Sequence, residues 1–344
     1  MAAGKGTRLF PLTSVIPKPM APVADKPMIQ HIFELLAHTG VEETHINAHY
    51  LADVILGHYG HKIEVGGMGV RFHREERLMG TAGGVKNAAG MAGFDDTFVV
   101  VMGDVLTDVD VREVVAFHKE KGATATLALT PVEDTTEYGV AVLDVEKRVV
   151  GFQEKPSPSE AISNLANTGI YVFEPRVLDH VPESAFFDFA KDLFPALLAA
   201  GERVVGYDVG GFYWSDIGTL SAYKQAQRDV LAGLVKVDID AERWGKDLWV
   251  GEKARIHPSA YGHMEGPAFV GTEAQVGPGA SFSGGVTIGR RCQVGGGATV
   301  KGSVLLPGAV VGRGAYLEDC IIGPGYEIGP GERLLGEALM GAAA

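Results

Sequence analysis

The sequence predicts an α/β domain followed by a β-helix, and three observations support this fold class. Strand-like and helix-like stretches alternate up to about residue 228, as in a layered α/β domain. Apolar residues then recur every six positions over residues 256–328, a period that fits neither a helix nor a flat strand. The length of 344 residues is more than one hydrophobic core usually serves, so we expect two domains.

The first regular element that the pattern predicts is a helix over residues 27–38. Its apolar residues fall on one face, Pro27 suits a first helical position, and Gly40 follows as a stop. We expect strands over residues 44–50, 69–75, 96–104, 123–132, 139–145 and 169–174.

The apolar run from Phe98 to Met102 does not alternate, which is typical of a central parallel strand covered on both faces. Gly103 and Asp104 come directly after it. Open α/β sheets bind ligands at this carboxyl end of their strands, so Asp104 is a candidate functional residue.

The six-residue period of the tail is carried by Val270, Val276, Phe282, Ile288, Val294 and Val300. It predicts a hexapeptide β-helix, in which short strands wrap a prism and one small or apolar side chain per face points inward. With roughly eighteen residues per coil, the tail should hold about four coils.

Composition excludes several classes of function. A net charge of -13 argues against nucleic-acid binding, which needs a broad basic surface. The chain contains neither an apolar run of membrane-spanning length nor a secretory leader, so we expect no membrane contact and a cytoplasmic location. Cys292 and Cys320 are too few for a disulfide framework and form no CxxC pair, so we expect both to be buried as small hydrophobes.

The chain begins with a glycine-rich basic segment, GKGTR at residues 4–8, with Lys18 ten residues after Arg8. The segment fits neither a Walker loop, which needs GxxxxGK and then Ser or Thr, nor a dinucleotide fingerprint, which needs a third glycine at Leu9. Glycines let the backbone approach phosphate oxygens, Arg8 can bind them bidentately, and Lys18 adds a point charge. A second GxGxR at residues 67–71 has no such lysine after it, and we interpret it as a turn that enters a strand.

Further motifs follow in order along the chain: LMGTAGG at 78–84, GD at 103–104, EYGV at 137–140, FQEKP at 152–156, NTGIY at 167–171, DFAKDLFP at 188–195 and YWSDIGT at 213–219. With GKGTRLFPLTSVIPKPM at the start, this set resembles the sugar-phosphate nucleotidyltransferases, also called nucleoside-diphosphate-sugar pyrophosphorylases. More narrowly, the chain resembles mannose-1-phosphate guanylyltransferases with a C-terminal left-handed β-helix. The resemblance covers nearly the whole chain and implies a Rossmann-like, mostly parallel sheet in the first domain.

The resemblance implies a reaction between two small-molecule substrates. An oxygen of a sugar-1-phosphate attacks the α-phosphorus of a nucleoside triphosphate, and pyrophosphate leaves. The second pKa of a phosphate monoester is about 6, so the nucleophile is ionised at neutral pH without a general base. Catalysis then depends on alignment and on neutralising charge.

Carried over residue by residue, the resemblance implies that Arg8, Lys18, Asp104 and Lys155 are catalytic. Arg8 and Lys18 would hold the triphosphate, and Lys155 would bind the sugar phosphate. Asp104 and Asp216 match the metal-binding pair of the family, and carboxylates are what the implied cofactor, Mg²⁺, requires. The other nucleotide-side matches are Ala3, Gly4, Gly6, Thr7, Glu75, Gly80 and Thr81, and the other sugar-side matches are Gly139, Glu154, Asn167 and Thr168.

Simpler interpretations compete with these roles. Asp104 could be a turn residue after a strand, and Asp216 could cap a helix that begins near Thr219. Glu75 lies five residues before Gly80, where relatives place a side chain on the base edge, but it could equally be a solvated charge at a strand end.

Glu75 indicates which nucleotide base the enzyme prefers. A carboxylate only accepts hydrogen bonds, and guanine offers two adjacent donors, whereas uracil and thymine would suit an amide better. We therefore favour GTP, and the resemblance implies mannose-1-phosphate as the sugar phosphate, with a glucose-1-phosphate uridylyl- or thymidylyltransferase as the alternative.

The tail leaves two interpretations open. We favour a structural β-helix through which the chain forms a homo-oligomer, a dimer or tetramer, because exposed coil ends and flat faces favour self-association. A bifunctional enzyme with an acyltransferase tail is the alternative, with His257 or His263 as its catalytic residue. A nucleotide-sugar sensor without catalysis is a further alternative, which the intact motif residues disfavour.

We expect a catalytic domain over residues 1–228, a linking helix and connection over 229–250, and the β-helix over 251–335. Relatives usually begin with several more residues, which form an apolar strand that leads into the glycine loop. Met1 stands where that strand should end, so we expect further residues upstream.

Overall fold

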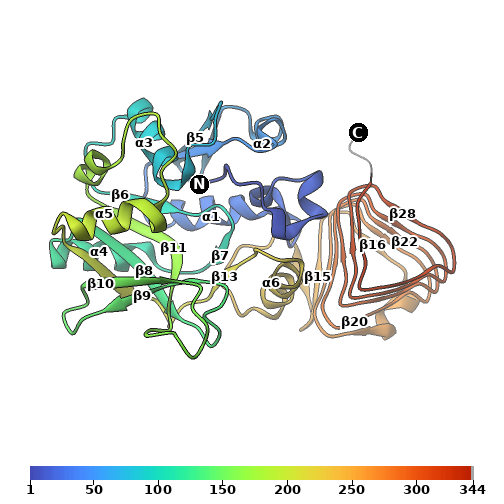
Figure 1. Ribbon diagram of the computed structural model, residues 1–344. Coiled ribbons are helices and arrows are strands. Elements are labelled where there is room, and N and C mark those ends of the chain that lie inside the picture. Colours follow the sequence, from blue (N-terminus) through green and yellow to red (C-terminus); the bar gives the residue numbers. More distant parts are fainter. Residues whose placement is uncertain (342–344) are drawn as a thin grey trace. The chain divides into compact units, whose positions relative to one another are not determined.

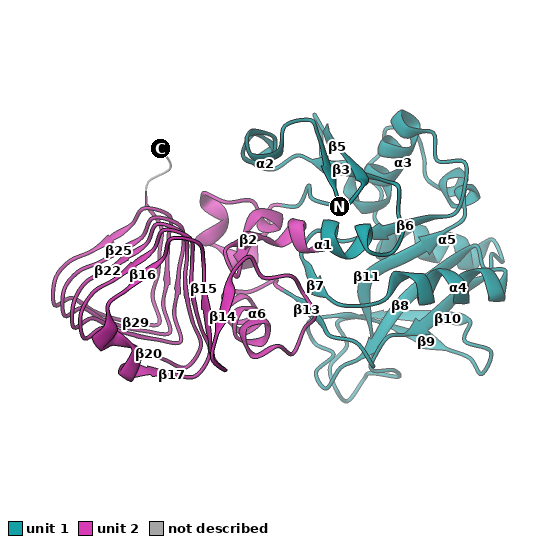
Figure 2. Cartoon of the chain, turned by 180° about the vertical axis from the view of Figure 1, so that it is seen from behind, with its two compact units in different colours: residues 1–4, 32–216 teal, residues 5–31, 217–344 magenta. Residues whose placement is uncertain are grey.

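The computed structural model describes residues 1–341 and confirms an α/β fold with a parallel β-solenoid at its C-terminal end (Figure 1). Contacts divide the chain into two compact units, which Figure 2 colours separately. The first unit contains residues 1–4 and 32–216, and the second contains residues 5–31 and 217–344. This division is based on contacts in space, and its limits differ from the domain boundaries that we predict from the sequence. Those boundaries stay a prediction.

The strands of the first unit form one larger and two smaller sheets. The larger sheet has the order β10-β9-β11-β8-β12, with β6 also paired to β11. Its strands are β6 (Phe98–Val101), β8 (Ala125–Pro131), β9 (Gly139–Leu143), β10 (Val149–Glu154), β11 (Leu165–Phe173) and β12 (Val204–Asp208). The smaller sheets are β3 (Glu43–Ala48), β5 (Met68–Arg74) and β4 (Lys62–Val65) in that order, and the pair β7 (Val105–Thr107) and β13 (Trp214–Asp216).

The larger sheet is mixed rather than mostly parallel. Strand β11 runs antiparallel to both β6 and β8, whereas β12 runs parallel to β8. The hydrophobic pattern of a buried strand reports that both faces are covered and does not report the direction of its neighbours. This is why the sequence placed the strands correctly and their direction incorrectly.

Helices of the first unit accompany these strands: α2 (Ala52–Tyr59), α3 (Gly80–Ala92), α4 (Val111–Lys121), the π-helical turn η5 (Phe189–Leu193) and α5 (Phe194–Ala199), with the 3₁₀ turn η4 (Pro175–His180). Helix α1 (Met28–Ala37) confirms the predicted helix over residues 27–38. All six predicted strands are present, and the predicted turn before residue 71 is the tight connection of Gly66 and Gly67 between β4 and β5.

The core of the first unit is rich in aromatic rings. Phe173, Phe189 and Phe194 are buried, and their ring centroids lie 5.5–6.5 Å apart. The start of the chain is also bound in this unit. The Met1 amine donates to the Val101 carbonyl at 2.8 Å, and the Met1 carbonyl accepts from the Gly103 N–H at 2.7 Å.

The second unit begins with irregular structure. It contains the 3₁₀ turns η1 (Thr7–Leu9), η2 (Leu12–Ser14) and η3 (Lys18–Met20), the hairpin β1 (Pro22–Val23) and β2 (Lys26–Pro27), and helix α6 (Leu220–Ala232). Leu9 and Leu12 are fully buried and anchor the first two turns.

The solenoid stacks parallel strands on three faces, which Figure 1 shows as a pile of similar coils. The first face runs from the hairpin β14 (Glu242–Trp244) and β15 (Leu248–Val250) through β18 (Ala268–Val270), β21 (Val286–Ile288), β24 (Val304–Leu305), β27 (Ile321–Ile322) and β30 (Ala338–Leu339). The second contains β16 (Arg255–Ile256), β19 (Gln275–Val276), β22 (Gln293–Val294), β25 (Val310–Val311) and β28 (Glu327–Ile328). The third contains β17 (Met264–Glu265), β20 (Ser281–Ser283), β23 (Thr299–Lys301), β26 (Tyr316–Glu318) and β29 (Arg333–Leu335), after the 3₁₀ turn η6 (Pro258–His263).

The predicted period is confirmed, because the six residues that define it are 0–4% exposed and point into the prism. Five strands on each of two faces make about five coils instead of about four. The difference arises at the ends, because end coils face solvent on one side and keep the apolar period less strictly. Cys292 and Cys320 are both buried and unpaired with each other, as expected, and burial raises the pKa of the Cys292 thiol to about 12.

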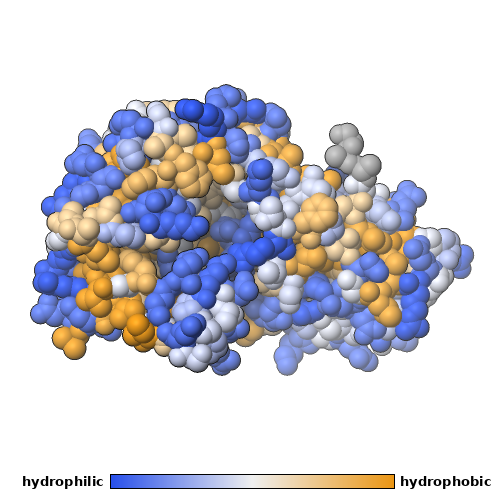
Figure 3. Space-filling view, in the orientation of Figure 1, coloured by the Kyte–Doolittle hydropathy of each residue, from blue (hydrophilic) through white to orange (hydrophobic). Residues whose placement is uncertain are grey.

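Hydrophilic residues cover much of the face drawn in Figure 3, with apolar patches between them. Within residues 1–341, no helix has both the length and the apolar character needed to cross a bilayer.

Candidate active site

The glycine-rich loop is folded onto Lys18 in the second unit. Gly6 has a φ of +60°, and a Cβ at this position would lie 3.1 Å from the Lys18 Cβ and 3.1 Å from the Thr13 Cγ2. The Thr13 hydroxyl donates to the Gly6 carbonyl at 3.0 Å. Both the backbone angle and the close contact therefore require glycine.

The two predicted triphosphate ligands of this segment differ in exposure. Arg8 lies on η1 and is exposed. Lys18 opens η3 and is only 8% exposed, and its carbonyl accepts from the Ala21 N–H at 3.1 Å. Thr7 begins η1 and is exposed, whereas Ala3 is buried and Gly4 exposed at the end of the segment 1–4 in the first unit.

In the first unit, Asp104 and Asp216 come together on a short ladder. Strand β13 pairs antiparallel with β7, and Asp216 lies opposite Val105. Asp104 directly precedes Val105 in the chain, so the two aspartates are neighbours across the ladder. Both residues are half-buried. The structure thus brings the backbones of Asp104 and Asp216 close together, and their role as a metal-binding pair stays a prediction.

The alternative role of Asp216 as a helix cap is wrong. Thr219 is the N-cap of α6, and its hydroxyl accepts from the Ala222 N–H at 3.1 Å. Asp216 belongs instead to the strand that precedes this helix.

Lys155, the predicted ligand of the sugar phosphate, is connected to the β7–β13 ladder by the aromatic pair Tyr138 and Trp214. Lys155 follows the end of β10, is exposed, and donates its backbone N–H to the Tyr138 carbonyl at 3.0 Å. The ring of Tyr138 packs edge-on against Trp214 of β13, with centroids 5.3 Å apart. Gly139 and Glu154 pair across the β9–β10 hairpin, and a Cβ on Gly139 would lie 3.1 Å from a Glu154 carboxylate oxygen.

A bulge in β11 holds the last two predicted sugar ligands. The register of β11 against β8 shifts after Asn167, whose side-chain oxygen accepts from the Gly169 N–H at 3.2 Å. Gly169 has a φ of +80°, and a Cβ there would lie 2.6 Å from the Met102 Cγ. The bulge therefore sets Gly169, which is bonded to the Asn167 side chain, against Met102 in the segment that leads into Asp104.

Thr168 is placed differently from Asn167. Its side chain is buried, and its hydroxyl donates to the Ala128 carbonyl at 2.8 Å. Its own carbonyl accepts from the Trp214 indole N–H at 2.8 Å. Thr168 thus fixes Trp214 and the bulge, and its hydroxyl is already committed to the backbone.

Glu75 is buried, with 3% of its surface exposed, so the alternative of a solvated charge is wrong. One carboxylate oxygen accepts from the Asn47 side-chain N–H at 2.7 Å, and Asn47 in turn accepts from the Ala2 N–H at 3.0 Å. The other oxygen, Oε2, has no hydrogen-bond partner among the described residues. A buried polar atom without a partner is costly, which makes Oε2 a candidate ligand-binding atom.

Gly80 and Thr81 fasten helix α3 to the loop before η5. Gly80 has a φ of +76°, and a Cβ there would lie 2.5 Å from the Phe187 carbonyl oxygen. The Thr81 hydroxyl donates to the Asp188 carboxylate at 3.0 Å and accepts from the Phe189 N–H at 2.7 Å. These contacts explain the motif at 78–84 by packing within the unit.

The donor set at the ladder fits a hard divalent cation. Among residues 1–341, no cluster of three or more acidic, histidine or cysteine side chains is arranged to enclose a metal. Two carboxylates on a ladder suit Mg²⁺, which usually takes one or two carboxylates and completes its shell with substrate phosphates and water.

In the tail, the His257 ring caps η6 by accepting from the Ser259 N–H at 3.3 Å.

Sequence reasoning missed three residues that organise the site. Thr13 and Asn47 hold the glycine loop and the start of the chain through single hydrogen bonds, and a lone polar residue in a sequence carries no signal of such a role. The sequence motifs gave Trp214 no role in the site. Its position two residues before Asp216 was the available signal, because alternate residues of a strand point to one face.

Comparison with known proteins decides the family. Residues 1–233 match the Nucleotidyl transferase family, and residues 264–344 match the GMPPB C-terminal domain. The chain belongs to the nucleotidyl transferase family.

Individual relatives support this assignment. This nucleotidyl transferase is 36% identical over 358 residues to a UTP–glucose-1-phosphate uridylyltransferase of Synechocystis sp., covering 99% of this chain and 86% of the relative. It is 35% identical over 289 residues to a mannose-1-phosphate guanylyltransferase of Mycobacterium tuberculosis, covering 83% and 78%. Its fold resembles the crystal structure of HddC from Yersinia pseudotuberculosis, with a TM-score of 0.57 and 25% identity over 67% of this chain and 96% of that one.

Proposed function

We propose that this nucleotidyl transferase couples a sugar-1-phosphate to the nucleotidyl group of a nucleoside triphosphate and releases pyrophosphate. The observation that carries the proposal is the ladder that sets Asp104 beside Asp216 in a family member. Similarity to the mycobacterial guanylyltransferase supports GTP and mannose-1-phosphate as substrates. Similarity to the Synechocystis uridylyltransferase favours a second candidate, UTP with glucose-1-phosphate.

In this mechanism, Arg8 and Lys18 bind the triphosphate and neutralise the charge that develops on the departing pyrophosphate. Lys155 orients the sugar phosphate as the nucleophile, and Asn167 and Glu154 bind sugar hydroxyls. Asp104 and Asp216 would hold Mg²⁺, which supplies positive charge to the phosphate oxygens when bound.

For the base, the unpartnered Oε2 of Glu75 supports guanine. This oxygen can accept a hydrogen bond, and guanine presents two adjacent donors on one edge. Replacement by glutamine would turn one acceptor into a donor, so Glu75→Gln should lower the preference for GTP over UTP.

The test is a pyrophosphate-release screen of the purified full chain. Five nucleoside triphosphates are combined with mannose-, glucose- and N-acetylglucosamine-1-phosphate in the presence of Mg²⁺. Turnover of one pair well above the others supports the proposal and names the substrates. No release with any pair, from protein that is folded by circular dichroism, would refute it.

We also propose that the solenoid joins copies of the chain into a dimer or tetramer and that the enzyme works in the cytoplasm. Light scattering on the full chain tests the assembly, and a monomeric mass at micromolar concentration would refute it.

A further inference from the structure

The hairpin loop that follows Lys18 has an unfavourable backbone conformation. Strands β1 and β2 pair as a hairpin with Val23 opposite Lys26, so only Ala24 and Asp25 form the loop. Their φ angles are +47° and +64°. A two-residue hairpin with both residues left-handed normally contains Asn-Gly, because a Cβ is unfavourable in this conformation. Such a turn persists only when its surroundings fix it.

Helix α6 fixes the first half of the turn through Gln227, whose side chain is 1% exposed. Its amide oxygen accepts from the Ala24 N–H at 3.0 Å and from the Thr287 hydroxyl of the solenoid at 3.2 Å. Its amide N–H donates to the Pro22 carbonyl at 2.6 Å. One buried amide thus joins the hairpin, α6 and the first solenoid face.

The solenoid fixes the second half of the turn through Arg290. Its Nε donates to the Asp25 carboxylate at 3.1 Å, and its terminal nitrogen donates to the Asp25 carbonyl at 2.6 Å. The Asp25 side chain is 8% exposed, and its other carboxylate oxygen has no hydrogen-bond partner among the described residues. Removing Arg290 would take from a buried carboxylate its arginine hydrogen bond and leave the charge of Arg291 to offset its burial, and breaking a buried pair on one side is costly.

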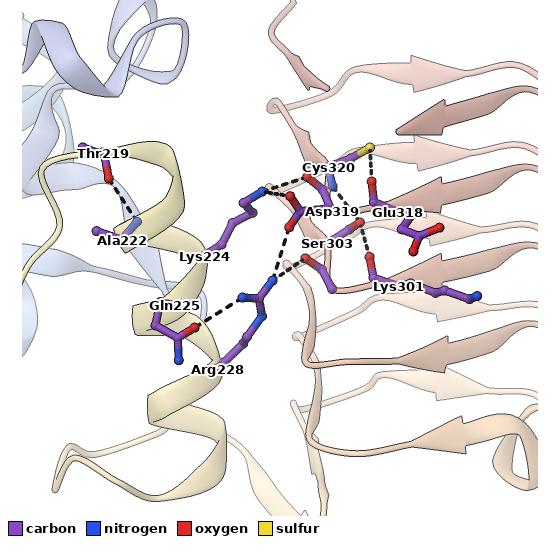
Figure 4. Close-up of polar contacts among 11 residues, drawn as sticks. Thr219, Ala222, Lys224, Gln225, Arg228, Lys301, Ser303, Glu318, Asp319 and Cys320 are labelled. Carbon is purple, nitrogen blue, oxygen red and sulfur yellow. Dashed lines mark hydrogen bonds and ion pairs between the residues drawn. The ribbon is translucent and has the colours of Figure 1, made fainter. Parts of the chain in front are cut away.

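Helix α6 is itself clamped to the solenoid, as Figure 4 shows. Lys224 and Arg228 lie one turn apart on α6 and both reach Asp319, at 2.5 Å and 3.3 Å. The Lys224 ammonium also donates to the Asp319 carbonyl at 2.9 Å. The helix that carries Gln227 is therefore held against the same solenoid that carries Arg290.

The hairpin connects directly to Lys18. The Ala21 N–H donates to the Lys18 carbonyl at 3.1 Å, and the Met28 N–H, beyond the hairpin, donates to the Ala21 carbonyl at 3.1 Å. A shift of the turn would therefore move η3 and the lysine that lies against Gly6.

We propose that the solenoid is part of the catalytic apparatus, and that Arg290 and Gln227 are positioning residues that hold the Ala24–Asp25 turn and, through it, Lys18. This inference rests on the proposed function, in which Lys18 binds the triphosphate. It gives the tail a role in every subunit, in addition to any role in assembly.

The first experiment compares Arg290→Ala with Arg291→Ala in the full chain. Arg291 is the matched control, because it is the next residue of the same solenoid turn and acts on Asp25 through its charge, without a hydrogen bond to it within residues 1–341. Arg290→Ala should lower kcat/KM for the triphosphate about 10- to 100-fold, with KM for the sugar phosphate nearly unchanged, because displaced positioning groups cost rates of this size. Arg290→Lys should recover part of the loss. A value of kcat/KM within twofold of wild type for stable Arg290→Ala would overturn the inference.

The second experiment makes the turn independent of Arg290. The double substitution Ala24→Asn and Asp25→Gly installs residues that adopt this turn unaided. Added to Arg290→Ala, it should restore kcat/KM to within about threefold of wild type, and it keeps the test available if the single variant does not fold. Failure to restore activity in a stable triple variant would contradict a positioning role.

A third variant separates the two proposals. If Lys18→Ala keeps full turnover, the assigned role of Lys18 is wrong and the positioning inference falls with it. If Lys18→Ala is inactive while Arg290→Ala is normal, only the positioning inference is wrong.

Discussion

Gly6 lies directly against the side chain of Lys18, so close that a Cβ on the glycine would stand 3.1 Å from the Cβ of the lysine. The glycine-rich loop and Lys18 are therefore one packed element rather than two neighbouring motifs. Substitution at either position should disturb the other.

Gly6→Ala should destabilise this element by about 1–2 kcal/mol, because alanine is unfavourable at a φ of +60°. We expect kcat/KM for the triphosphate to fall roughly tenfold, measured by pyrophosphate release. Gly4→Ala should cost less, because within residues 1–341 no atom beyond its two chain neighbours lies within 4 Å of where its Cβ would stand. Equal effects of the two substitutions would show that packing against Lys18 is unimportant.

Asp104→Asn and Asp216→Asn should each lower kcat/KM by about a thousandfold, as when a preorganised electrostatic group is removed from an active site. EDTA should abolish turnover of the wild-type enzyme, and added Mg²⁺ should restore it. Asp108→Asn is the control, because Asp108 accepts from the Tyr213 N–H at 2.7 Å through an oxygen that asparagine retains. Normal activity in either variant at Asp104 or Asp216 would remove it from the proposed metal site.

Lys155→Met should raise KM for the sugar phosphate about 10- to 100-fold and leave KM for the triphosphate nearly unchanged, since one charged hydrogen bond is lost. Lys147→Met is a matched control, because Lys147 is also exposed, also has a positive φ, and lies in the turn at the other end of the β9–β10 hairpin. The two variants are compared by varying each substrate in turn. A change confined to the triphosphate KM would assign Lys155 to the wrong substrate.

Stability should fall as the pH drops below about 6.5, the ordinary pKa of histidine. His45 and His73 stack with centroids 5.0 Å apart, and their facing ring nitrogens lie 2.7 Å apart. Burial lowers the pKa of both rings, with Glu43 opposing the shift and Arg71 adding to it. The unfolded chain therefore binds more protons than the folded one below pH 6.5, so protonation favours unfolding. Above that pH the contribution is fully present.

Urea unfolding at pH 7.5 and pH 5.5 measures this effect. His73→Gln should reduce the loss of stability between the two values, because one buried ring no longer has to gain a proton. The buried ring of His118, whose pKa is also lowered by burial, should leave part of the pH dependence in place. An identical loss in wild type and His73→Gln would contradict the assignment.

Sequence periodicity predicted the elements well, because burial on one face or two leaves a clear pattern. The inward valines and isoleucines of the solenoid and the apolar strand β6 are examples. It did not predict that β11 runs antiparallel to β6, because strand direction depends on connections rather than on side-chain order.

The candidate site was partly predictable for a similar reason. The resemblance of its motifs predicted Gly6, Lys18, Asp104 and Asp216 as site residues, but not the groups that hold them. Gln227 contacts Ala24, which lies 203 residues earlier in the sequence. No local sequence pattern predicts a contact over such a separation. Fold-dependent contacts of this kind can be found only in three dimensions.

Residues 5–31 share a compact unit with the described residues from 217 onward, so two segments far apart in the sequence pack together. Recombination between homologues that exchanged only the tail would pair a foreign solenoid with a native hairpin and mismatch Asp25 with whatever replaced Arg290. Chimaeras should therefore fold when residues 5–31 and the solenoid come from one parent, so these two segments should be exchanged together rather than the solenoid alone.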